Sequence, residues 1–210
     1  MMIIEYEGNL HDRLTKIMDL EDQGKLRVTK LIAAGAGYYK LQDQYYGGKG
    51  VFFNPNSENR FSLPDKSKWP MYLAESPHTA CSEFYQNEEF IDRSDFTTNC
   101  MVEISVQKPL KVFDETRLAP HLRISVGDLM GPRSVYIFTQ KLSKALADHA
   151  DGLEYLSRHN GQPCVGLWSD KLDGGGILLT TSVTRLSKYE HQGKTARQIL
   201  KSECNLRITG

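Results

Sequence analysis

The chain has 210 residues, of which 40% are hydrophobic and 25% are charged, a size and composition that support one core of fair size rather than two domains. Basic and acidic residues each number 26, and this balance excludes a global field that would draw the protein to nucleic acid or to an anionic membrane. Any site for an anion must therefore be local.

The sequence favours a cytoplasmic protein with no bound metal. No stretch reaches the ~18 consecutive apolar residues of a membrane span, and the N-terminal MMIIEYEGNLHDR has acidic residues where a signal peptide would be basic. The histidines lack His-x-x-x-His spacing and the cysteines lack Cys-x-x-Cys spacing, which argues against zinc. We expect reduced packing cysteines: Cys81, Cys100, Cys164 and Cys204.

The first part of the chain predicts helices followed by a long loop. Residues 11–31 carry apolar side chains among charges at a spacing that favours one or two short amphipathic helices. We therefore expect a helical N-terminal extension over residues 1–37 and the main domain over residues 38–210. Glycine, asparagine and proline over residues 47–67 predict an irregular loop, and loops of that length are often functional.

Local signals become clearer from residue 69 onward. Residues 71–74 predict a short strand, and Ser76 followed by Pro77 predicts the start of a helix that runs to about residue 87. Residues 101–107 alternate apolar and polar side chains, which indicates a half-buried strand, and 110–113 predict another.

The second half predicts further strands and helices. Residues 134–138 read as a strand and Thr139 as the cap of a helix behind it. Strands are expected at 153–157, after a turn at Asp151-Gly152, and at 164–168. The glycines at 174–176 predict a hairpin return into 177–184, and residues 195–206 predict a helix. Strands outnumber helices without regular interleaving, so we predict an α+β fold: a single domain with mostly antiparallel sheet and flanking helices.

Arg60 is the first candidate for anion binding. An arginine in a polar loop is usually a solvated charge, but Phe53 and Phe61 should fix this loop to the core and hold the guanidinium in place. A fixed guanidinium can bind phosphate with two parallel hydrogen bonds. Lys40, next to Tyr39, could add a second positive charge to the same site, or could be an exposed lysine at a strand end.

Tyr72 and Glu83 are the next candidates. Because Met71 and Leu73 must face the opposite side of the strand, Tyr72 is presented either to the core or to a cleft. Glu83 lies about two turns into the helix that starts at Ser76, near its buried side, where a carboxylate needs a partner. Either a structural partner satisfies it, or it faces a pocket and acts on a ligand.

The third candidate segment is DGLEYLSRHNG, in which Tyr155 and Ser157 share one face of a short strand. Ser157 could bind a phosphate or a sugar, although a serine at a strand end is by default solvated. No Gly-x-Ser-x-Gly elbow surrounds it, and the chain has neither a Rossmann nor a phosphate-loop glycine pattern.

These segments, in this order, resemble the RES-domain family, which is named for an arginine, a glutamate and a serine. The resemblance covers about residues 38–181 and matches Arg60, Glu83 and Ser157 to those three residues. Its motifs are Tyr39-Lys40, Phe52-Phe53-Asn54-Pro55, Asn59-Arg60-Phe61, Tyr72-Leu73-Ala74, Ala80-x-x-Glu83 and Asp151-Gly152-Leu153-Glu154-Tyr155-x-Ser157. One departure is Lys40, where the family usually has an arginine, because lysine keeps the charge but loses the planar fork.

The resemblance implies a bacterial toxin with an ADP-ribosyltransferase-like fold that consumes NAD+ as a phosphorylase or glycohydrolase, or that modifies proteins. It implies Arg60, Glu83 and Ser157 as catalytic residues and Tyr39, Lys40, Tyr72 and Tyr155 as substrate-binding residues. NAD+ would be the substrate, inorganic phosphate a possible co-substrate, no further cofactor would be needed, and an Xre-like antitoxin or an immunity protein would be the partner. The alternative is a non-catalytic nucleotide-binding or interaction domain in which Glu83 and Arg60 form a structural ion pair.

Overall fold

The computed structural model describes residues 7–44, 49–86 and 88–210. The expectations for residues 1–6, for residues 47–48 of the long loop and for the end of a helix at residue 87 lie outside this part. Within it, no helix is both long and apolar enough to cross a membrane.

Eight strands of the described residues form one sheet in the order β1-β6-β7-β8-β3-β2-β5-β9. Strands β6 and β7 run parallel, and every other pair of neighbours in this described sheet is antiparallel. The predicted α+β class with a mostly antiparallel sheet is therefore confirmed. The strands are β1 (Thr29–Ile32), β2 (Gly37–Gln42), β3 (Trp69–Ala74), β5 (Cys100–Val106), β6 (Leu110–Asp114), β7 (Gly152–Leu156), β8 (Pro163–Ser169) and β9 (Leu178–Arg185).

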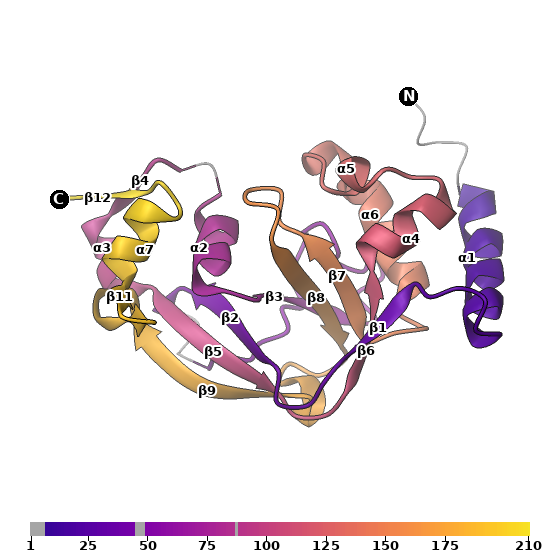
Figure 1. Ribbon diagram of the computed structural model, residues 1–210, viewed down its shortest axis with the longest axis horizontal. Helices are drawn as coiled ribbons and strands as arrows, with labels where there is room; N and C mark the ends of the chain where they lie inside the picture. Colours follow the sequence, from indigo (N-terminus) through magenta and orange to yellow (C-terminus); the bar gives the residue numbers. More distant parts are fainter. Residues whose placement is uncertain (1–6, 45–48, 87) are drawn as a thin grey trace.

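The sheet bends into an open V with helices on its inner side (Figure 1). Helices α2, α3 and α7 lie over one arm, and α4, α5 and α6 lie over the other. The helices are α1 (Glu7–Asp22), α2 (Pro77–Tyr85), α3 (Arg93–Thr98), α4 (Glu115–Leu122), α5 (Val126–Leu129), α6 (Tyr136–Leu146) and α7 (Ala196–Ser202), with short 3₁₀ turns η3 (Arg133–Val135), η4 (Gly174–Gly176) and η5 (Leu186–Lys188). Two small pairs complete the described elements: β4 (Phe90–Asp92) with β12 (Arg207–Thr209), and β10 (Glu190–His191) with β11 (Lys194–Thr195).

Each face of the sheet has its own hydrophobic core. Alternation along β3 places Met71 and Leu73 in the outer core, so that Tyr72 faces the helices, as the sequence indicates. The segment between β2 and β3 is fixed at two points, because Phe53 is fully buried in the outer core and Phe61 is buried in the inner one. The prediction that these two phenylalanines fix the segment to the core is confirmed.

Three predicted elements are wrong. Residues 29–32, expected to be helical, form β1 at the edge of the sheet. Residues 134–138 belong to η3 and α6 instead of a strand, because the parallel pair β6 and β7 needs a crossover connection and helices supply it. The glycines at 174–176 do not close a hairpin, since β9 pairs with β5 and β8 pairs with β3 and β7.

Candidate active site

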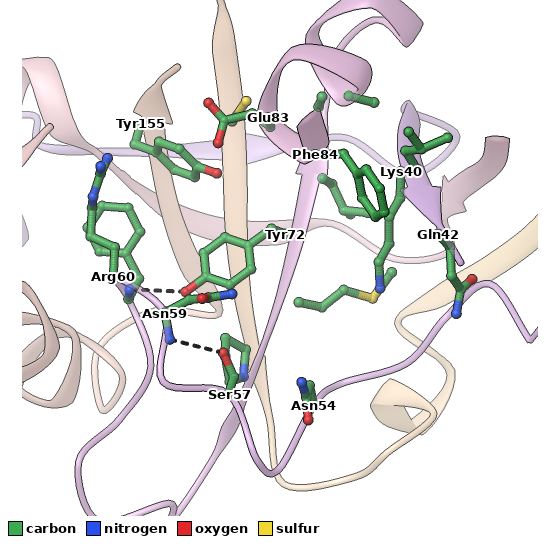
Figure 2. Close-up of a pocket in the computed structure, with 18 of the residues that line it drawn as sticks. Lys40, Gln42, Asn54, Ser57, Asn59, Arg60, Tyr72, Glu83, Phe84 and Tyr155 are labelled. Atoms are coloured by element: carbon green, nitrogen blue, oxygen red, sulfur yellow. Dashed lines mark hydrogen bonds between the residues drawn. The ribbon is translucent and has the colours of Figure 1, made fainter. Parts of the chain in front are cut away.

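A cleft of about 340 Å³ opens where β2 and β3 separate. These neighbouring strands pair at Tyr39 and Ala74 and then diverge, so both contribute side chains to its walls. The segment between them, helix α2 and residues near the end of β7 complete the lining (Figure 2). Of the residues predicted for the site, six line this cleft: Tyr39, Lys40, Arg60, Tyr72, Glu83 and Tyr155.

Arg60 lies in the wall with 8% of its surface exposed. Its Nη2 donates to the carbonyl oxygens of Met130 at 3.2 Å and Gly131 at 3.0 Å, while its buried Nε has no hydrogen-bond partner in the structure described. The guanidinium carbon lies 5.6 Å from the centre of the Tyr136 ring, within the range of a cation–π contact. Arg60 is thus held in place while part of its donor set stays unused.

The backbone around Arg60 is held as firmly as its side chain. The Phe61 N–H donates to the Tyr72 hydroxyl at 3.0 Å, and the Trp168 indole donates to the Phe61 carbonyl at 2.8 Å. Thr139, inside α6 rather than capping it, donates from Oγ1 to the Arg60 carbonyl at 2.7 Å. Three separate elements therefore fix the position of this arginine.

Tyr72 and Tyr155 form an aromatic wall. Their ring centres lie 6.4 Å apart in an edge-on arrangement, and the Tyr155 ring lies 5.0 Å from that of Phe61. Burial raises the pKa of both phenols well above the usual range, so each hydroxyl stays protonated. These two side chains therefore bring aromatic surface and no charge to the wall.

Glu83 faces the cleft with an unpaired carboxylate. Helix α2 begins after Ser76, whose hydroxyl accepts from the Thr79 N–H at 3.3 Å, and two turns later it presents Glu83 beside Tyr155 (Figure 2). The buried Oε1 of Glu83 has no hydrogen-bond partner, and no ion pair joins it to Arg60 within the described chain. A buried acceptor without a partner is costly, so this oxygen would gain a hydrogen bond from a ligand once the side chain turns toward the cleft.

Tyr39 and Lys40 mark the β2 side of the cleft. The Tyr39 ring contacts His191 edge-on at 5.4 Å, and burial together with the charge of Glu103 raises the pKa of its hydroxyl. Burial lowers the pKa of Lys40 to about 8. Its amine makes no ion pair with any residue that the structure describes.

Ser157 does not line the cleft. It is fully buried, and its Oγ accepts the backbone N–H of His159 at 3.2 Å. The neighbouring Arg158 and His159 do line the cleft, and burial lowers the pKa of His159. Ser157 therefore shapes the turn that carries these two side chains.

Glu115 is a buried carboxylate that sequence reasoning missed. It lies at the first position of α4 with 1% exposure, and its Oε2 accepts the Leu156 N–H at 3.2 Å. Burial raises its pKa to about 7, against the lowering effects of that hydrogen bond and of the Arg60 charge. An acidic residue at a helix start reads as an ordinary cap, so its burial beside Arg60 could not be seen in the sequence.

The described residues contain no group of three or more His, Cys, Asp and Glu side chains that could hold a metal ion. The cleft itself is lined by the carboxylates of Asp43 and Glu83, by the cationic side chains of Lys40, Arg60 and Arg158, and by aromatic rings and amides. Such a set can bind an anion and stabilise positive charge developing on a sugar carbon.

Comparisons with known proteins identify the fold and the family of the chain. None of the curated proteins compared with the chain matches its sequence. Among solved structures 13 chains match. One is in the crystal structure of the M. tuberculosis MbcT-MbcA toxin-antitoxin complex, with a TM-score of 0.51 and 16% sequence identity over 83% of this chain and 90% of that one. At this identity the likeness establishes a shared fold.

The model of the RES domain matches residues 34–182. The match spans most of the chain and contains every residue that lines the wall of the cleft around Arg60 and Glu83. The protein belongs to the RES domain family.

Proposed function

We propose that this protein cleaves the bond between nicotinamide and ribose in NAD+ and transfers the ADP-ribose to water or to inorganic phosphate. The observation that carries the proposal is the free Oε1 of Glu83 in a cleft whose walls also hold Arg60 and Lys40. The resemblance of the chain to NAD+-consuming RES proteins supports the choice of substrate.

The nicotinamide of NAD+ is already a cationic leaving group. Its departure needs little acid catalysis, and the main task is to stabilise an oxocarbenium-like ribose and hold the dinucleotide in a reactive shape. Glu83 would accept a hydrogen bond from the ribose and offset the positive charge that develops there. Because its free oxygen is buried beside Tyr155, the low local dielectric strengthens this interaction.

Arg60 and Lys40 would hold the pyrophosphate or an attacking phosphate. Tyr72 and Tyr155 would pack against a ring of the substrate, as their neutral, buried phenols allow. Ser157 would act as a positioning residue, because its hydroxyl holds the turn that brings Arg158 and His159 to the cleft.

To identify the acceptor of the ADP-ribose, purified protein is incubated with NAD+ in the presence and absence of phosphate, and the products are identified by mass spectrometry. ADP-ribose identifies hydrolysis, ADP-ribose 1″-phosphate identifies phosphorolysis, and a mass added to a protein identifies the alternative transferase activity. Glu83→Gln should lower the rate by roughly 10²- to 10³-fold, as for loss of one key electrostatic group. Glu88→Gln, an exposed acid just beyond α2, is the matched control and should act like the parent.

The structural neighbour comes from a toxin-antitoxin complex, so we also propose that this protein is a toxin restrained by an antitoxin partner. Induced expression of the parent should arrest growth, while Glu83→Gln, folded to the same extent, should not. Intact NAD+ under all these conditions, together with equal growth of parent and variant, refutes the proposed function. The rival structural Glu83–Arg60 ion pair is absent from the described residues.

A further inference from the structure

The cleft continues along β2 past the residues used above. Lys40 and Gln42 lie two positions apart and so share one side of the strand. Both line the cleft, as do Asn54 from the segment between β2 and β3 and Phe84 from α2. Figure 2 shows Phe84, Lys40 and Gln42 on one side of Tyr72, and Arg60 and Tyr155 on the other.

Gln42 is a buried amide without partners. Its exposure is 3%, and neither Nε2 nor Oε1 has a hydrogen-bond partner. Leaving both a donor and an acceptor unpaired away from water is unfavourable, and buried groups of this kind are uncommon in folded proteins. Because both atoms are enclosed, the side chain must turn toward the cleft before a ligand can pair with them.

Lys40 adds an unpaired cation to the same side of β2. Lys40 is half-buried, and no hydrogen bond or ion pair to a described residue compensates its charge. An ammonium and a primary amide side by side, both without partners, suit a ligand with an anionic group next to a planar edge that carries both a donor and an acceptor.

Phe84 supplies an aromatic face to this group. It follows Glu83 on α2 and keeps 42% of its surface exposed while lining the cleft. An exposed ring at a polar cleft is a stacking platform for a nucleobase. Adenine presents an amino donor beside a ring nitrogen acceptor, and a glutamine amide pairs with this edge through two hydrogen bonds.

We propose that Phe84, Gln42 and Lys40 form a subsite for the ADP half of a nucleotide ligand. Phe84 stacks on adenine, Gln42 pairs with its amino edge, and Lys40 neutralises the diphosphate. This assignment rests on the proposed function and deepens it, because it leaves the space next to Glu83 and Tyr155 for the nicotinamide ribose. It also makes Gln42 the residue that selects adenine.

Calorimetric titration tests the subsite without any turnover. The probes are ADP, purine riboside 5′-diphosphate, which lacks the amino group, and pyrophosphate, which lacks the base. The parent should bind ADP about 10- to 100-fold more tightly than the purine riboside diphosphate, as expected for a pair of hydrogen bonds to one base edge. Equal affinities for these two probes would overturn the proposal, and this comparison needs only the parent protein.

Two variants then separate the roles. Gln42→Leu should abolish the preference for ADP over the purine riboside diphosphate and leave the affinity for pyrophosphate unchanged. Lys40→Met should weaken the binding of ADP and of pyrophosphate by a similar factor. Gln107→Leu, an exposed glutamine outside the cleft, is the control and should bind like the parent. A Gln42→Leu protein that keeps the preference for ADP overturns the subsite.

The melting temperature controls for folding. Gln42→Leu removes an unpaired buried amide, so its ligand-free melting temperature should equal or exceed that of the parent. The outcomes also separate the two proposals. NAD+ cleavage without any preference for ADP refutes the subsite alone, and a preference for ADP that depends on Gln42 without NAD+ cleavage refutes the proposed function alone.

Discussion

Lys40→Met should make the ligand-free protein more stable at neutral pH, because the substitution removes a half-buried charge that has no counter-ion among the described residues. Burial lowers the pKa of Lys40 from 10.5 to about 8. Since one pKa unit corresponds to about 1.36 kcal/mol, keeping this amine charged in the fold costs about 3 kcal/mol. Methionine has a similar length and no charge, so at pH 7 the variant should gain up to about that amount.

The stability advantage of Lys40→Met over the parent should decrease as the pH rises. Below pH 8 the lysine is protonated in both the folded and the unfolded chain, so the full cost applies. Between pH 8 and 10.5 the unfolded chain binds more protons, and the free energy of unfolding of the parent rises with pH. The advantage of Lys40→Met should therefore shrink across this window and vanish above it.

Urea unfolding of parent and variant at pH 7, 8.5 and 10, followed by circular dichroism, measures this difference. Lys108→Met, an exposed lysine between β5 and β6, is the control and should show a small difference that does not change with pH. The reasoning fails if Lys40→Met is no more stable than the parent at pH 7, or if its advantage is the same at all three pH values.

Three further perturbations test the framework of the cleft. Tyr72→Phe keeps the ring but leaves the Phe61 N–H without its acceptor, so the free energy of unfolding should fall by about 1–3 kcal/mol, and an unchanged urea midpoint would contradict this. Glu115→Gln should be more stable than the parent by up to about 3 kcal/mol at pH 8, because burial raises the pKa of Glu115 to about 7. This carboxyl stabilises the fold fully below pH 4.5 and loses that contribution as pH rises through 7, so the difference should disappear in acid, as urea titrations at pH 4 and 8 would show. Gly152→Ala would place a Cβ 2.4 Å from the Gly166 carbonyl oxygen, so it should destabilise by at least about 1–3 kcal/mol, and an unchanged melting temperature would refute that.

Local signals predicted the elements that carry most of the site. The Ser76-Pro77 start of α2 and the alternation in β3 are short-range patterns, and they place Glu83 and Tyr72 on the side where the structure has them. Arg60 and Tyr155, also expected at the site, line the same cleft as Glu83 and Tyr72. Helix capping and strand alternation depend on neighbours within a few residues, which is why they can be read from the sequence.

Features that depend on distant partners were not predictable in this way. Residues 134–138 look like a strand, but they lie in the crossover that the parallel pair β6 and β7 requires. The missing partners of Gln42 and the burial of Glu115 are properties of the tertiary fold. Ser157 was expected to line the cleft. The alternation along the strand could not show that the chain turns after Leu156, so that the Ser157 hydroxyl holds the turn instead of reaching the cleft.

Because β2 and β3 pair over so short a length, we expect the two parts of the sheet on either side of this contact to move as separate rigid units. Within the described strands, β2 and β3 pair only where Tyr39 lies opposite Ala74. By contrast, β5 pairs with β9, and β3 with β8, along most of their lengths. Local thermal unfolding should start between β2 and β3, where the fewest hydrogen bonds between strands must break. A ligand that contacts both β2 and β3 would hold the two parts of the sheet together, and amide hydrogen exchange in both strands should then slow.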